Sequence, residues 1–137
     1  MALKTVLFLA AAMAASLTIP SAVAQEHGRV FEQRTYTCNE GKLPDLLARF
    51  RNHTTRLFEK HGMTNIAYWV PQDAPASQNT LIYIIAHASR DAAKKNWDEF
   101  RADAEWQKVQ KDSEANGKIV SKFESVFMDP TDFSPMK

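Results

Sequence analysis

His53 is the residue best placed by type and position to do acid–base chemistry. It falls on the rim of the apolar stripe of a predicted helix, from which its imidazole could point into a cleft between helix and sheet. A neutral histidine with a pKa lowered by burial can act as a base towards an acidic C–H or O–H group of a ligand. The alternative interpretation is a histidine that is hydrogen-bonded at the edge of the core.

Arg34 and Tyr36 lie two residues apart on a predicted strand and therefore share one face of it. If that face meets the helices, the guanidinium could bind a carboxylate or an enolate, and the phenol could donate a hydrogen bond to the same group. If the face meets a partner sheet instead, Arg34 is expected to pair with Glu32 or with a carboxylate of the other protomer. The sequence leaves both interpretations open.

The histidine and cysteine spacing does not predict a metal site. His61 precedes Gly62 in the last turn of the helix, where it meets the negative end of the helix dipole, so we expect a structural role. His53 and His61 are separated by about 12 Å of helical rise, too far to bind one metal ion. We therefore expect neither a metal nor a cofactor. A single axial haem ligand at His53 or His87 has no spacing requirement and stays open.

The runs 65–70 and 80–88 predict central strands, because both sets of their alternating residues are apolar. Both runs contain large aromatic residues, which are more often part of a core or an interface than of a ligand site. The candidate ligand-binding residues are Arg34, Tyr36, His53, Trp69 and Tyr83.

Periodicity predicts strands over 30–38, 63–70, 80–88 and 119–128, and helices between them. The first helix has Pro44 in its first turn, ends before Gly62 and turns Arg49 towards solvent. The second is capped by Ser89 and breaks near 102–104, where Asp103 caps a further short helix. The two prolines of 71–79 are expected to keep this loop irregular.

This βαββαβ order predicts an α+β, ferredoxin-like unit, a four-stranded antiparallel sheet with the helices on one face. The other face keeps an apolar set of side chains. Leaving several hundred Å² of such surface in water would cost on the order of 10 kcal/mol, comparable to the stability of a whole domain. We therefore expect a homodimer in which two copies pair through the open faces of their sheets.

Residues 1–24 are expected to form a signal peptide, with Lys4 before a short apolar segment and Ala22-Val23-Ala24 at the cleavage site. The apolar segment is shorter than the roughly 20 residues of a membrane-spanning helix. The mature domain would be 25–137, exported to the periplasm or secreted, with no membrane association. Its sixteen basic and sixteen acidic side chains predict no binding to nucleic acid.

Several segments in order resemble the NIPSNAP family: Phe31–Tyr36 with Gly41-Lys42, Glu59–Gly62, Tyr68–Val70, Trp97–Asp103 with Trp106, and Pro130–Pro135. The resemblance spans nearly all of the mature chain and implies the dimeric α+β barrel, a ferredoxin-like unit paired sheet to sheet. The family has no single agreed activity, and its members look like small interaction or ligand-binding modules. Related barrel families include cofactor-independent monooxygenases and haem-degrading enzymes.

Two functional hypotheses follow. The preferred one is an exported NIPSNAP-like dimer that binds a small apolar or aromatic ligand or serves as an interaction module. The alternative is a cofactor-independent enzyme of the monooxygenase or isomerase type, with His53 as the base and Arg34 or Tyr36 stabilising the developing anion. The sequence does not decide whether the protein is an enzyme.

Overall fold

The computed structural model describes residues 28–137, so the signal peptide predicted at 1–24 lies outside the described residues. The strands are β1 (Val30–Cys38), β2 (Thr64–Trp69), β3 (Thr80–His87) and β4 (Val120–Met128). The helical segments are α1 (Leu43–Arg49), η1 (Phe50–Thr54), α2 (Thr55–Lys60), α3 (Ala76–Asn79), α4 (Arg90–Ala102) and α5 (Ala104–Ser113).

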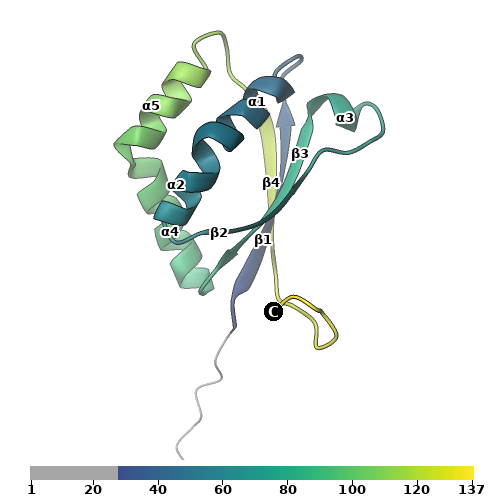
Figure 1. Cartoon of the computed structure of the whole chain (residues 1–137), viewed down its shortest axis with the longest axis vertical. Helices are drawn as coiled ribbons and strands as arrows, with labels where there is room; N and C mark the ends of the chain where they lie inside the picture. Colours follow the sequence, from purple (N-terminus) through teal and green to yellow (C-terminus); the bar gives the residue numbers. More distant parts are fainter. Residues whose placement is uncertain (1–27) are drawn as a thin grey trace, which may run out of the picture.

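The four strands form one antiparallel sheet in the order β2-β3-β1-β4. Figure 1 shows α1, α2, α4 and α5 together on one side of this sheet, while no helix of residues 28–137 crosses the other side. The two crossovers, from β1 to β2 and from β3 to β4, both carry their helices over that same face. The predicted ferredoxin-like α+β arrangement is confirmed.

The first helical crossover is continuous from Leu43 to Lys60, but its middle, η1, is a π-helix that the sequence did not predict. The hydroxyls of Thr54 and Thr55 donate to the carbonyl oxygens of Arg49 and Phe50, five residues earlier in each case, at 3.3 and 3.2 Å. These bonds fit the wider turn. Gly62, with φ of 77°, ends the segment as predicted.

The second crossover breaks where the sequence indicated. Ser89 accepts a hydrogen bond from the backbone N–H of Ala92 at 3.0 Å and caps α4. Asp103 then separates α4 from α5 and accepts from the N–H of Glu105 at 2.7 Å. Both predicted caps are confirmed. The prediction of a fully irregular loop at 71–79 was wrong in one detail, because Ala76–Asn79 form the short helix α3 directly after the second proline.

The core lies between the sheet and the helices and is rich in aromatic rings. Tyr83 of β3 is at its centre, with ring centroids 5.2 Å from Phe50 and 5.4 Å from Tyr68. Phe58 of α2 contacts Trp97 and Phe100 of α4 with centroids 5.3 and 5.0 Å apart. These edge-to-face contacts fix how the helices sit on the sheet.

The opposite face of the sheet is largely open. Trp69 of β2 and Val126 of β4 remain 51% and 55% exposed. The C-terminal segment 129–136 folds back at one end of this face, beside Phe31, Ile84 and Met128; its yellow loop is visible in Figure 1. Apolar surface therefore remains on the side away from the helices.

Candidate functional site

Arg34 and Tyr36 lie on the face of β1 that meets the helices, which decides between the two interpretations that the sequence left open. Their register partners on β3 are Tyr83 and Leu81, both buried under the helices. Arg34 Nη1 donates to the Tyr36 hydroxyl at a long distance of 3.5 Å. Arg34 also pairs with Glu32, so the ion pair expected for the other face forms on the helix side.

His53 does not reach the space between helix and sheet, and the position predicted for it was wrong. In the π-helical turn the inward positions are Phe50 and Thr54, which leaves Arg51, Asn52 and His53 exposed. The wider turn places three consecutive side chains outside, so the imidazole faces an outer groove between η1 and α5. Whether His53 binds anything there stays a prediction.

The two aromatic candidates also lie apart from each other. Tyr83 is fully buried at the centre of the core. Trp69 lies on the open face of the sheet, beside its register partner Ile82. The five predicted ligand-binding residues therefore do not form one site: of the five, only Tyr36 lines the cleft described below, with Tyr83 one layer behind it.

A buried carboxylate, Glu32, organises the most complete polar network beneath the helices. Its side chain is fully buried and accepts four hydrogen bonds. Arg34 Nε and the Ser125 hydroxyl donate to Oε1 at 2.6 and 2.7 Å. His87 Nε2 and the Trp97 indole N–H donate to Oε2 at 2.8 and 2.7 Å. The four donors come from β1, β4, β3 and α4.

The network continues through Asn96, whose side-chain amide lies 3.2 Å from His87 Nδ1 and donates to the carbonyl of Gly62 at 3.2 Å. With the Asn96 amide as the donor to Nδ1, Nε2 is the ring nitrogen that donates to Glu32. Both ring nitrogens are engaged, so neither is free for a haem iron while this network is intact. Glu32 and Arg34 then balance each other in charge.

Burial alone would raise the pKa of Glu32, but the hydrogen bonds from His87, Trp97 and Ser125 and the charge of Arg34 outweigh it and lower the pKa to about 2. The guanidinium of Arg34 stacks over the Trp97 ring, with Cζ 3.7 Å from the centroid. Both carboxylate oxygens of Glu32 thus have partners, and Arg34 is held by its bond to Glu32 and by its stacking on Trp97.

A second region, which we call the α5–β4 cleft, has a different character. It is a cavity of about 330 Å³ between α5, β4 and the inner side of η1. This is at the lower end of the volumes that bind small organic molecules. Its lining residues are Tyr36, Arg49, Phe50, Thr54, Phe58, Phe100, Trp106, Gln110, Glu114, Lys118, Val120, Ser121, Lys122 and Phe123.

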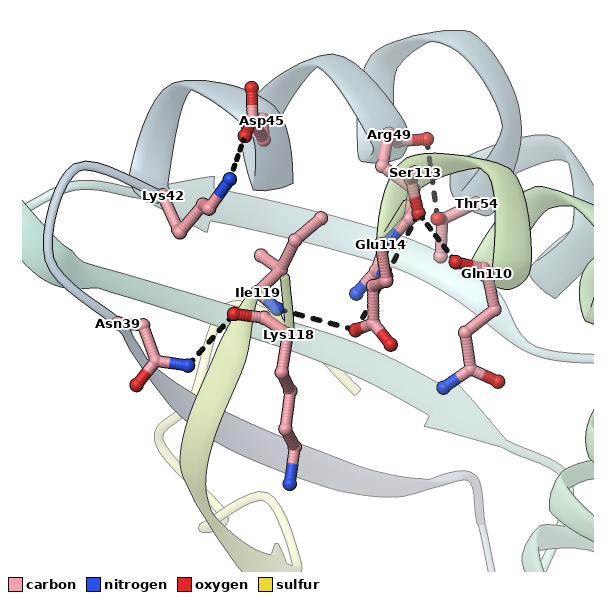
Figure 2. A network of polar contacts seen from close by, with 10 residues as sticks. All are labelled: Asn39, Lys42, Asp45, Arg49, Thr54, Gln110, Ser113, Glu114, Lys118 and Ile119. Carbon is pink, nitrogen blue, oxygen red and sulfur yellow. Dashed lines mark hydrogen bonds and ion pairs between the residues drawn. The ribbon is translucent and has the colours of Figure 1, made fainter. Parts of the chain in front are cut away.

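Arg49 is the charged residue buried in this cleft. It is only 6% exposed, so the prediction that it faces solvent was wrong. The reason is tertiary, because α5 packs along the outer flank of α1 and covers the arginine. Figure 2 shows its guanidinium beside Ser113 and Glu114 at the end of α5. Its Nη1 donates to both, at 3.3 and 3.4 Å.

Within residues 28–137, two buried side-chain atoms have no hydrogen-bond partner. One is Nε of Arg49 and the other is the hydroxyl of Tyr83. The Tyr83 ring lies directly behind Tyr36 and Phe50, two rings of the cleft wall, with centroids 5.2 Å away in both cases. Because nearly all buried polar side-chain atoms in native structures have a hydrogen-bond partner, each of these two atoms calls for an explanation.

Two buried titratable groups, Tyr83 and Cys38, lie outside the lining of the cleft. Burial raises the pKa of Tyr83 well above its usual value and also raises that of the Cys38 thiol. Neither group therefore ionises near neutral pH. Among residues 28–137, no group of three His, Cys, Asp or Glu side chains is placed to hold a metal ion. No helix of that part is long and apolar enough to cross a bilayer.

Sequence reasoning missed Arg49 and the importance of Glu32. A signal for Glu32 existed. This carboxylate lies in the middle of a predicted strand and shares one face of it with Val30, Arg34 and Tyr36. No comparable signal existed for Arg49, because the helical periodicity places it among the polar residues outside the apolar stripe. The pair Thr54-Thr55 was the sequence feature associated with the π-helical turn, because both hydroxyls donate to carbonyl oxygens five residues earlier.

Comparison with known proteins agrees with this architecture. The sequence model of the family described as NIPSNAP matches residues 31–135. A NIPSNAP family protein of unknown function from Agrobacterium tumefaciens is 22% identical, with a TM-score of 0.69 over 81% of this chain and 96% of that chain. An uncharacterised NIPSNAP-like domain protein from Burkholderia xenovorans is 16% identical, with a TM-score of 0.68 over 80% and 90%.

A more distant similarity connects the fold to an enzyme. SnoaB, a cofactor-independent oxygenase from Streptomyces nogalater, is 13% identical, with a TM-score of 0.51 over 79% of this chain and 98% of that chain. At this identity the similarity concerns the fold. No curated protein matches the sequence.

Proposed function

The chain belongs to the NIPSNAP family, and from this premise we propose that it is a small-ligand-binding protein that works as a homodimer. The ligand occupies the α5–β4 cleft of each subunit. The second copy covers the open face of the sheet. The observation that carries the proposal is the cleft itself, an aromatic-walled cavity of about 330 Å³ with an incompletely bonded arginine in its wall.

The walls of the cleft suit a small aromatic or apolar ligand. Tyr36, Phe50 and Trp106 come from β1, η1 and α5, so the rings surround the space from different sides. Such walls supply most of the contact area in small-molecule sites, while a few polar groups fix orientation. Arg49, Gln110 and the Tyr36 hydroxyl are polar groups of this kind.

The dimer is proposed from the exposed apolar side chains opposite the helices. Trp69 and Val126 stand on that face, and the neighbouring Ile82 and Ile84 are only half-buried. The NIPSNAP protein of similar structure and SnoaB share the fold of this chain, and the family resemblance implies a dimeric α+β barrel. Packing of two sheets face to face would remove these side chains from water.

A cofactor-independent oxygenase remains the second candidate, favoured by the structural similarity to SnoaB. His53, the base in that hypothesis, lies in the outer groove, whereas Tyr36 lines the cleft. Tyr36 would then be the proton-bearing group next to a substrate. Consumption of oxygen together with a bound hydroxylated aromatic compound would favour this candidate over simple binding.

The test is binding of two naphthalene probes, naphthalene-2-carboxylate and naphthalen-2-ylmethanol, followed by fluorescence. We expect wild-type protein to bind at least one of them. Gln110→Trp should block binding, because residue 110 lines the cleft on exposed α5. Gln107→Trp, on the same helix but outside the cleft lining, is the control. Unchanged binding by Gln110→Trp would contradict the proposed site.

Native mass spectrometry of protein taken from the periplasmic fraction tests the remaining parts of the proposal. We expect a dimer at micromolar concentration and a mass that begins at Gln25, the residue after the predicted cleavage site. Ile82→Glu should shift the dimer to monomers, because it places a charge on the open face. A monomeric wild type, or a full-length chain retained in the cytoplasm, would contradict the corresponding part.

A further inference from the structure

The guanidinium of Arg49 makes few of the hydrogen bonds available to it. An arginine side chain carries five N–H donors. The contacts to Ser113 and Glu114 both use Nη1, and at 3.3 and 3.4 Å they are longer than typical bonds. Nε is buried and has no partner. For comparison, the carboxylate of Glu32 lies 2.6 Å from Nε of Arg34.

A buried cation with so few partners reduces stability unless something else compensates it. Arg49 occupies a helix position where a leucine or methionine would bury well against the Trp106 ring, 5.2 Å from its Cζ. The chain places a guanidinium there instead. A ligand that completes the hydrogen bonds of this guanidinium would explain the charge.

The charges around the cleft favour an anion. The lining includes Arg49 and Lys118, one carboxylate, Glu114, and Lys122, whose ammonium is paired with Glu124 at 2.9 Å. The carboxylate of Glu114 is already shared, since its Oε1 also accepts from the backbone N–H of Ile119 at 3.4 Å. Figure 2 shows Glu114 between the guanidinium of Arg49 and Ile119, the residue directly before β4. An arriving anion would therefore meet a net positive surface.

We propose that the ligand of the α5–β4 cleft is a planar aromatic carboxylate whose carboxylate binds the guanidinium of Arg49. Its ring lies against Phe50, Tyr36 and Trp106. The carboxylate takes the donors that Glu114 leaves unused, and a fork of two parallel N–H donors is the geometry that arginine offers to such a group. This inference rests on the proposed function and specifies its ligand class.

The test compares naphthalene-2-carboxylate with naphthalen-2-ylmethanol, a neutral molecule of similar shape, by titration calorimetry at fixed salt. Wild-type protein should bind the carboxylate about tenfold or more tightly, as expected for a charge-assisted hydrogen bond. Arg49→Met should lose this preference. Arg51→Met is the matched control, because Arg51 is an exposed arginine two residues further along the same helix, and it should keep the preference.

Each other outcome has a distinct meaning. Equal affinity of the two probes for wild-type protein would overturn the inference while leaving the cleft as a binding site. Absence of binding by both would overturn the inference and the proposed site together. A preference that survives in Arg49→Met would place the anion elsewhere. If Arg49→Met does not fold, Arg49→Lys replaces it, and its preference should fall below that of wild type because a lysine offers no fork.

Discussion

Glu32 and Arg49 are both charged side chains buried on the helix side of the sheet, yet their surroundings are opposite. Glu32 accepts four hydrogen bonds between 2.6 and 2.8 Å from four elements of the fold. Arg49 makes two long contacts to the end of one helix, and its Nε has no partner. A complete network holds the sheet and α4 together, whereas an incomplete one leaves donors for a molecule from outside.

We therefore expect Glu32 to contribute mainly to the stability of the domain and Arg49 mainly to ligand binding. Loss of Glu32 should cost stability without any ligand present, and loss of Arg49 should cost binding with little change in stability.

Glu32→Gln should give the largest effect, a loss of about 3–5 kcal/mol in the free energy of unfolding. The amide NH₂ of glutamine would face the N–H and O–H groups that now donate to Glu32. The substitution also removes the negative charge that balances Arg34. Urea denaturation followed by circular dichroism measures the loss. The control is Glu124→Gln, an exposed carboxylate on β4, which should change stability by less than about 0.5 kcal/mol. A loss below about 1 kcal/mol in Glu32→Gln would remove the basis of the contrast.

Trp97→Phe should cost about 1.5–3 kcal/mol, because the indole N–H donates to Glu32 at 2.7 Å and a phenyl ring leaves that acceptor short of one bond. The stacking of Arg34 would also weaken. Trp106→Phe, half-buried in the same aromatic cluster, is the comparison and should cost less. Equal losses in both variants would mean that ring packing, not the bond to Glu32, sets the effect.

The pH dependence of stability should carry the signature of Glu32. Its folded-state pKa of about 2 lies below the ordinary value of 4.5, so its contribution is present above pH 4.5 and is lost as the pH falls towards 2. The difference in stability between wild type and Glu32→Gln should therefore shrink over that interval. Denaturation curves at several pH values measure it. A constant difference down to pH 2 would mean that Glu32 does not titrate in this way.

Arg49→Met should change the free energy of unfolding by no more than about 1 kcal/mol in either direction. The methionine can pack against Trp106, and Glu114, which is partly exposed, keeps the backbone N–H of Ile119 as a donor. The same urea experiment gives the value. A loss as large as that of Glu32→Gln would show that Arg49 is a structural residue, and the contrast would disappear.

Much of the fold could be predicted from local patterns. The limits of β1, the cap at Ser89 and the break at Asp103 follow from alternation, helical periodicity and capping chemistry, all of which depend on neighbouring residues. The order of the elements, read from the same patterns, predicted the ferredoxin-like arrangement. These features needed no knowledge of contacts between distant segments.

The site could not be predicted in the same way. The partners of Glu32 on β3, α4 and β4 lie 55, 65 and 93 residues away, so a single strand shows only an unexplained carboxylate. Arg49 is buried by α5, which packs on α1 only in the folded chain. His53 was assigned to the rim of a regular helix, but the π-helical turn exposes it. In each case a tertiary contact or an irregular turn decided the environment.

The most direct test of a ligand at Arg49 is an NMR titration that observes Arg49 and Arg34 in the same spectrum. Side-chain ¹H–¹⁵N resonances of the Nε groups of Arg49 and Arg34 are followed while naphthalene-2-carboxylate is added to wild-type protein. The account predicts a saturable shift of the Arg49 resonance and a nearly constant Arg34 resonance, because Arg34 Nε is already bound to Glu32. A shift of Arg34 with no change at Arg49, or no shift of either, would contradict it.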